Sequence, residues 1–165
     1  MALNQSLLQE LEQESSNTRK MLQRVPEEHF GWKPHEKSTT LGSLASHVAE
    51  ITHWLTRLLT TTEYDLAGVN DKPVIAATSS ELMQIFEDNL AKAKEELLKA
   101  PDDVFMQKWK LRSGEKIFFE IPKIAVIRSM AMNHLIHHRA QLSVYLRLLN
   151  VPVPGMYGPT ADEPM

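Results

Sequence analysis

Residues 123–150 read KIAVIRSMAMNHLIHHRAQLSVYLRLLN, a segment without glycine or proline. Its apolar residues recur at the spacing of a helix with one buried face: Ile124, Ile127, Ala131, Leu142, Tyr145 and Leu149. At 100° per residue, His134 and His138 lie about 40° apart around this helix and about 6 Å apart along it. Both point in the direction of the apolar stripe, so the two imidazoles can reach one metal ion.

Three further segments show a helical period. They are residues 3–24, residues 41–62 after a cap at Thr39 or Thr40, and a segment that follows a cap at Ser79 or Ser80 and ends before Pro101. Residues 26–40 and 64–78, the second including Asn70 and Asp71, lack a period and are the expected connections. Four helices of about this length predict an all-α protein, a four-helix bundle, with residues 1–165 as a single domain.

Two segments depart from this helical pattern. Residues 104–122 carry β-branched and aromatic residues on both sides of Ser113-Gly114, which predicts a short extended excursion or hairpin between the third and fourth helices. Residues 151–165 hold four prolines and two glycines. We expect this tail to be irregular, with part of it packed back on the helices.

The composition excludes several classes of function. The chain has 165 residues, a formal net charge of -3 and no cysteine. The charge provides no basic field for a nucleic acid, and the absence of cysteine excludes disulfides, thiol nucleophiles, iron–sulfur clusters and cysteine-bound zinc. No apolar run approaches the ~20 residues of a membrane span, and we expect no secretory signal before the first helix. We therefore expect a cytoplasmic protein without a membrane or nucleic-acid partner, and any metal must be bound by nitrogen and oxygen.

A third histidine lies on the segment 41–62. The helical angles place His47 on the same side as Leu44 and Leu58, toward the interior, and turn His53 toward solvent. Three neutral imidazoles plus water form an open site that suits Zn²⁺ and also accepts Ni²⁺, Fe²⁺ or Co²⁺. An inward histidine is, however, more often a hydrogen-bonded core residue than a ligand. The angles alone leave both a metal site and a metal-free core open.

Two separated groups of motifs carry a family resemblance. They read WKP at 32–34, LGSLASHVAE at 41–50 followed by Trp54, NHLIHHRAQL at 133–142, VYLR at 144–147 and VPGMYGP at 153–159. In this order the motifs resemble the DinB family, which belongs to the DinB/YfiT-like metalloenzymes. Together they cover most of the chain, and the middle segment is the least diagnostic.

The resemblance implies a four-helix bundle in which three histidines hold a divalent metal, and many family proteins carry nickel or zinc. Carried onto this sequence, the ligands are His47, His134 and His138, the residues that the helical angles also indicate. Family proteins are often homodimers, so a homodimer is expected here.

The resemblance also bears on activity. Characterised relatives in the wider superfamily use low-molecular-weight thiols; they include bacillithiol S-transferases, mycothiol-dependent maleylpyruvate isomerases and glutathione-dependent enzymes. We therefore expect a metal-dependent enzyme with an unknown small-molecule substrate, either an S-transferase with a low-molecular-weight thiol as co-substrate or a hydrolase. The alternative is a non-catalytic, stress-associated dimeric bundle that binds metal. The two differ in whether the fourth coordination position opens to a pocket.

Several residues beside the three histidines are candidates for supporting roles. Glu50 could hydrogen-bond a ligand imidazole or form an ordinary salt bridge. Asn133, Arg139 and Gln141 could orient ligands or tie the last helix to the tail, and Gln141 has the most favourable angle for contact with the cavity. His137 is either a replacement ligand or a surface or dimer residue, and the family pattern favours the second role.

The tail contributes two more candidates. Tyr157 and Asp162 lie in a motif that resembles one found in the family. They could close over the site, or they could form a turn and an anchor.

Overall fold

The computed structural model describes residues 2–68 and 73–164. Asn70 and Asp71, which the sequence assigns to a connection, lie outside the described residues. The helices are α1 (Leu3–Leu22), the 3₁₀ turn η1 (Glu27–His29), α2 (Leu41–Glu50), α3 (His53–Thr60), α4 (Ser79–Lys99), α5 (Asp102–Met106), α6 (Lys123–Val126), the π-helix η2 (Ile127–Asn133) and α7 (His134–Leu148). The strands are β1 (Glu63–Asp65), β2 (Lys108–Ser113) and β3 (Lys116–Pro122).

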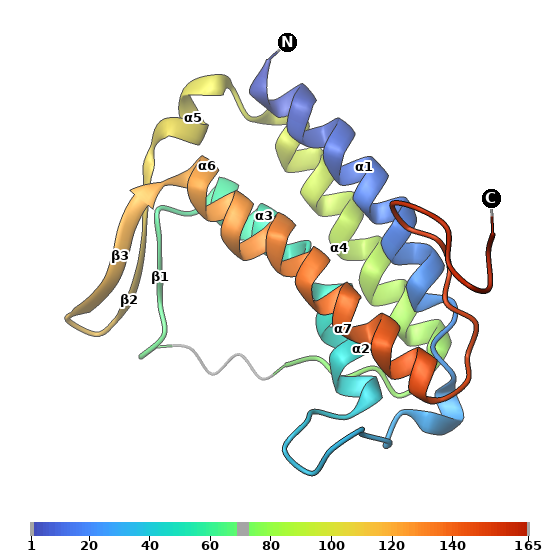
Figure 1. The fold of residues 1–165 in the computed structure, drawn as a ribbon. Coiled ribbons are helices and arrows are strands. Elements are labelled where there is room, and N and C mark those ends of the chain that lie inside the picture. The colour runs from blue at the N-terminus through green and yellow to red at the C-terminus, as the bar shows by residue number, and fades with distance from the viewer. Residues whose placement is uncertain (1, 69–72, 165) are drawn as a thin grey trace.

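The long helices bury their apolar stripes against one another. α1 and α4 lie side by side and run in opposite directions, while α2 and α3 pack against α4, and α7 packs against α2 and α1 (Figure 1). The core includes buried side chains from each of these helices: Leu11, Leu44, Leu58, Phe86, Leu97 and Leu142. Within the described residues, no helix combines the length and apolar character needed to cross a lipid bilayer.

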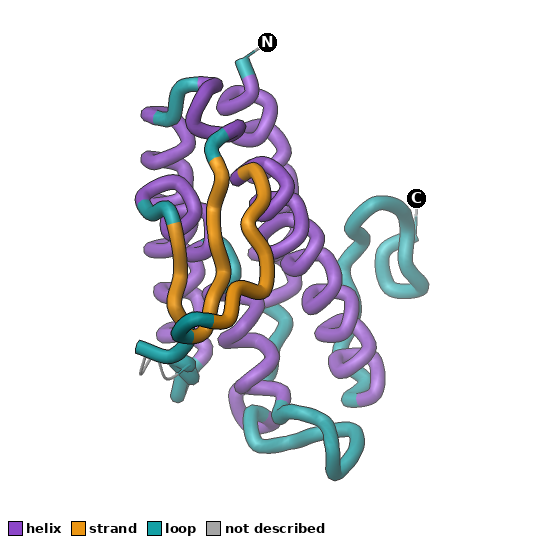
Figure 2. The backbone as a smooth tube through the Cα atoms, turned by 90° about the vertical axis from the view of Figure 1, so that its left-hand side faces the viewer, coloured by secondary structure: helices purple, strands orange, loops and turns teal. Residues whose placement is uncertain are grey.

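The prediction of an all-α four-helix bundle is wrong, because the chain also forms a three-stranded mixed sheet. The strand order is β1-β2-β3, with β1 parallel to β2 and β2 antiparallel to β3. The sheet lies along one flank of the helices (Figure 2). β1 was missed because its three residues, Glu63, Tyr64 and Asp65, are all half-buried and too few to show a period. A strand this short forms only because β2, far along the chain, supplies its hydrogen-bond partners.

The hairpin expected between residues 104 and 122 is confirmed by the antiparallel pairing of β2 with β3. Gly114 lies in its turn with φ of 58°, a conformation that glycine adopts at little cost. Trp109 of β2 is fully buried, and its indole Nε1 donates a hydrogen bond to Thr61 Oγ1 at 3.0 Å. The indole therefore fixes the hairpin to the end of α3.

The helix expected over residues 41–62 is divided into α2 and α3. Thr40 is its cap, since its hydroxyl accepts a hydrogen bond from Ser43 N. At Ile51 and Thr52 the ladder tightens: Trp54 N donates to Ile51 O, three residues back, at 3.0 Å. This bend separates His47 on α2 from His53 on α3, and His53 is half-buried rather than turned fully to solvent.

α6, η2 and α7 form one continuous helix over residues 123–148. The seven residues of η2 are wound as a π-helix that ends immediately before His134. π segments are rare and often occur at functional sites. Because a π turn contains more residues than an α turn, the constant 100° rotation used for the sequence does not hold across η2.

Two irregular segments brace these helices. The loop before α2 packs closely on it: Gly42 N donates to Phe30 O at 2.9 Å, and a Cβ on Gly42 would lie 3.0 Å from Phe30 Cβ. The expected return of the tail is confirmed, since Val153 is buried and Met156 O accepts a hydrogen bond from Asn17 of α1 at 3.4 Å.

Candidate metal centre

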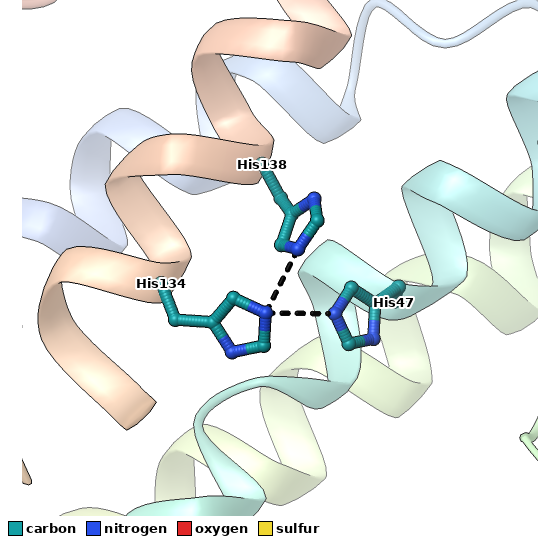
Figure 3. A group of neighbouring side chains, drawn as sticks. All are labelled: His47, His134 and His138. Atoms are coloured by element: carbon teal, nitrogen blue, oxygen red, sulfur yellow. Dashed lines mark hydrogen bonds between the residues drawn. The ribbon is translucent and has the colours of Figure 1, made fainter. Parts of the chain in front are cut away.

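Three histidine side chains converge between α2 and the start of α7. His134 Nε2 lies 3.3 Å from His47 Nε2 and 2.8 Å from His138 Nε2 (Figure 3). One ring nitrogen from each residue lies within 4.8 Å of the other two. The three residues that the spacing and the family resemblance predict are therefore brought together.

The outer nitrogens of two rings have oxygen acceptors. His134 Nδ1 lies 3.2 Å from the Met130 carbonyl oxygen in η2, and His138 Nδ1 lies 2.7 Å from Gln141 Oε1. A carbonyl oxygen only accepts, so each Nδ1 must carry the proton and donate it. In that tautomer each Nε2 presents a lone pair to the centre, which is the form that binds a metal.

Burial favours the neutral form of two imidazoles, those of His47 and His138. Burial, together with the neighbouring imidazoles of His138 and His134, lowers the pKa of His47 to about 4. Burial also lowers the pKa of His138, although its hydrogen bond to Gln141 acts in the opposite direction. His47 and His138 are thus uncharged at neutral pH, and an uncharged imidazole is the state required of a ligand.

The two separations that join His134 Nε2 to His47 and His138 fit a common ion. With metal–nitrogen bonds of about 2.0–2.1 Å, two ligands lie about 3.3 Å apart at a tetrahedral angle and about 2.9 Å apart at a right angle. The observed separations of 3.3 and 2.8 Å are close to these values. Two Nε2 lone pairs that face each other at 2.8 Å repel unless a cation lies between them. The three histidines are therefore positioned to bind a divalent metal ion.

Two cavities meet at His47. One, of about 380 Å³, is bounded by His47 and His138 and by Ser43, Leu44, Val74 and Ile75. The other, of about 210 Å³, is bounded by His47 and by Glu50, His53, Trp54, Arg57 and Tyr64. The His47 side chain therefore borders both cavities.

The structure places the residues predicted to support His47, His134 and His138 in different surroundings. Gln141 borders the larger cavity and accepts from His138, as its angle indicates. Glu50 borders the smaller cavity. Asn133 is exposed, and so is His137, whose ring lies 4.9 Å from that of His138 but which does not belong to the converging set.

Arg139, Tyr157 and Asp162 act as anchors. Arg139 binds Glu14 of α1 and the Tyr157 hydroxyl, and Asp162 binds Arg147 and accepts from Val153 N. Neither Tyr157 nor Asp162 borders the two cavities at His47. The turn-and-anchor alternative thus describes the tail, and a lid over the site does not.

Sequence reasoning missed several residues that shape the site. The Met130 carbonyl is available to His134 through the winding of η2, which periodicity does not reveal. Trp54 borders the smaller cavity with Arg57, whose guanidinium carbon lies 4.1 Å from the centroid of the Tyr64 ring. Val74 and Ile75, which line the larger cavity, follow Pro73 in a loop. An apolar pair in a polar connection was the only sequence signal that could have indicated them.

Comparison with known proteins gives a family from a family model and a shared fold from solved structures. The model of the DinB family matches residues 1–164. A search of curated proteins found no match to the chain. Among solved structures, a DinB-like protein (YjoA) from Bacillus subtilis is similar with a TM-score of 0.72 and 16% identity, over 92% of this chain and 97% of that one. A DinB-like protein from Bacillus cereus has a TM-score of 0.68 and 22% identity, over 91% and 95%. At these identities, the structural likeness concerns the fold.

Proposed function

The chain belongs to the DinB family, and from this premise we propose that it is a metal-dependent enzyme that acts on a small molecule. His47, His134 and His138 are its metal ligands. The observation that carries the proposal is the convergence of three Nε2 atoms at the point where two cavities meet. A purely structural metal is usually enclosed by four protein ligands, whereas a three-ligand site beside cavities leaves a position for a reactant.

Zn²⁺ or Ni²⁺ is the proposed ion. Both accept imidazole nitrogen, and neither needs the thiolate ligands that a chain without cysteine does not have. When bound, such an ion acts as a Lewis acid and lowers the pKa of a water or thiol beside it.

The proposed reaction is transfer of a low-molecular-weight thiol to an electrophile. The thiol loses its proton, its sulfur forms a bond to the electrophilic carbon, and the leaving group departs with its electron pair and takes up a proton. Two cavities that share the His47 wall can accommodate two reactants. The roles of the chain's own residues are positional: the Met130 carbonyl and Gln141 orient two of the imidazoles.

Metal content tests the site. Untagged protein, purified without chelator and incubated with Zn²⁺ or Ni²⁺, is analysed by inductively coupled plasma mass spectrometry. We expect close to one ion per wild-type chain, and loss of that ion in His47→Ala and His134→Ala. His137→Ala is the matched control because His137 is exposed, precedes His138 directly and is outside the trio. An ion-free wild type, or equal loss in the control, would refute the proposal.

Activity tests the reaction. Metal-loaded protein is incubated with a thiol, such as bacillithiol or glutathione, and a panel of electrophiles, and thioether formation is followed by mass spectrometry. Thiol-dependent product that disappears in His134→Ala supports S-transfer. Product formed from water without thiol indicates a hydrolase, and a metal-loaded protein with neither activity indicates the non-catalytic alternative.

A further inference from the structure

The two cavities at His47 differ in chemical character. The smaller one includes the ionisable side chains Glu50, His53 and Arg57 in its wall. The larger one, of about 380 Å³, has no carboxylate, ammonium or guanidinium group among the described residues that line it. Its volume lies in the range of sites for small organic molecules, which begins at about 300 Å³.

The larger cavity opens directly onto the candidate metal centre. His47 and His138 both belong to its wall, and so does Gln141, which orients His138. A molecule bound through one atom beside the three Nε2 atoms would therefore extend its remaining part into this space. Two of the imidazoles and Gln141 share the wall of this cavity with the apolar side chains of Leu44, Val74 and Ile75.

The apolar residues of this wall, Val74 and Ile75, are held in place by a neighbouring hydrogen bond but are not part of the buried core. Val74 and Ile75 are 50% and 57% exposed. The next residue, Ala76, is buried, and its backbone N–H donates to Ser46 Oγ at 2.9 Å, which ties this loop to α2. Two large apolar side chains are thus fixed beside a cavity with much of their surface in water. A ligand that covers them gains the free energy of removing that surface from water.

We propose that the larger cavity binds the uncharged, apolar part of the substrate, an alkyl, acyl or aryl group, and that Val74 and Ile75 set the preference for its size. This inference rests on the proposed metal centre, because the reacting end of the same molecule must lie at His47 and His138. The cavity beside Trp54 and Arg57, with its ionisable wall, is left for the polar co-substrate.

Binding of a homologous series of metal-binding probes tests the inference. Acetohydroxamic, butanohydroxamic and hexanohydroxamic acids share one chelating group and differ only in the length of the alkyl chain. Their affinities for Zn²⁺-loaded protein are measured by isothermal titration calorimetry. We expect affinity to rise about fourfold for each methylene group that enters the cavity.

Variants locate the alkyl chain. Ile75→Asp should remove most of the increase in affinity with alkyl-chain length. It should leave the affinity for acetohydroxamate within about twofold of wild type. Ile75→Trp should fill the cavity and weaken only the longer probes. Leu98→Asp is the matched control, since Leu98 is 63% exposed on α4 and does not border the cavity. It should keep the full dependence on chain length.

The outcomes separate the two proposals. If the protein binds no Zn²⁺, the proposed function fails and this inference fails with it. If Zn²⁺ binds and acetohydroxamate does not, or if affinity does not change with chain length, the apolar subsite is refuted while the metal centre stands. If affinity increases with alkyl-chain length equally in wild type and Ile75→Asp, the alkyl chain lies elsewhere. That result would also refute the subsite.

Discussion

Neighbouring residues of α7 belong to two polar clusters that are built differently. Arg139, almost completely buried, binds Glu14 Oε2 at 2.5 Å, the Glu14 carbonyl at 2.9 Å and Thr18 Oγ1 at 3.0 Å. The Tyr157 hydroxyl completes this cluster by donating to Glu14 Oε2 at 2.6 Å. His138, one residue earlier, belongs instead to the half-buried group of three imidazoles.

The difference between the clusters lies in how their charge and lone pairs are balanced. In the arginine cluster one guanidinium faces one carboxylate, and Glu14 Oε2 accepts from both Arg139 and Tyr157. In the histidine cluster the inward nitrogens of three bases face one another. The first cluster is complete without a ligand and joins α1, α7 and the tail. The second is positioned to bind a cation, which would balance its inward lone pairs.

The largest expected effect follows from breaking the complete cluster. Arg139→Met leaves the Glu14 carboxylate buried without its cation, which should lower the free energy of unfolding by about 3–5 kcal/mol. Urea denaturation measures this change. Metal content of the folded fraction should remain that of wild type, because Arg139 has no contact with the three Nε2 atoms.

Arg147→Met is the control for this substitution. Arg147 pairs with Asp162 but is 48% exposed, so its loss should lower the free energy of unfolding by less than about 1 kcal/mol. Equal destabilisation by the two variants would show that burial does not distinguish the arginine cluster from a surface pair.

The histidine cluster should respond to metal, and the arginine cluster should not. Zn²⁺ or Ni²⁺ at a concentration of 100 times its dissociation constant should raise the free energy of unfolding by about 2.7 kcal/mol, provided that the unfolded chain does not bind the ion. Thermal denaturation with and without the ion, and after addition of chelator, measures the effect. In His134→Ala the increase should disappear; an undiminished increase there would place the ion elsewhere.

Sequence reasoning succeeded where the determining interactions are local. His134 and His138 are four residues apart on one helix, and the inward direction of His47 follows from residues within one or two turns. The same reasoning could not find β1, because Glu63–Asp65 becomes a strand only by pairing with residues of β2. The angles calculated from the sequence also assumed a uniform α-helix, whereas η2 is wound as a π-helix. Periodicity, moreover, does not show which loop residues line a cavity.

A smaller effect is expected from the side chain that orients His138. Gln141→Leu removes the acceptor for His138 Nδ1, and loss of such a partner typically weakens metal affinity about 10- to 100-fold. Competition with a chromophoric chelator measures the affinity. Gln141→Glu keeps an oxygen acceptor at the same position and should retain affinity near that of wild type. If both variants bind as tightly as wild type, Gln141 does not orient the ligand.

The smallest effect is expected where the arginine cluster meets solvent. Tyr157 is 63% exposed, yet its hydroxyl donates to Glu14 and accepts from Arg139, so Tyr157→Phe removes two hydrogen bonds to charged groups. Such bonds contribute about 1.5–3 kcal/mol when buried, but water can replace the hydroxyl at this exposed edge, and we expect a loss of about 1 kcal/mol.

Tyr145→Phe, which removes only a 3.3 Å hydrogen bond to Thr39 O, should cost less. Urea denaturation compares the two variants, and metal analysis should find Tyr157→Phe unchanged. A loss of metal in Tyr157→Phe would mean that the two clusters are coupled through α7, and the division between a structural and a binding cluster would then fail.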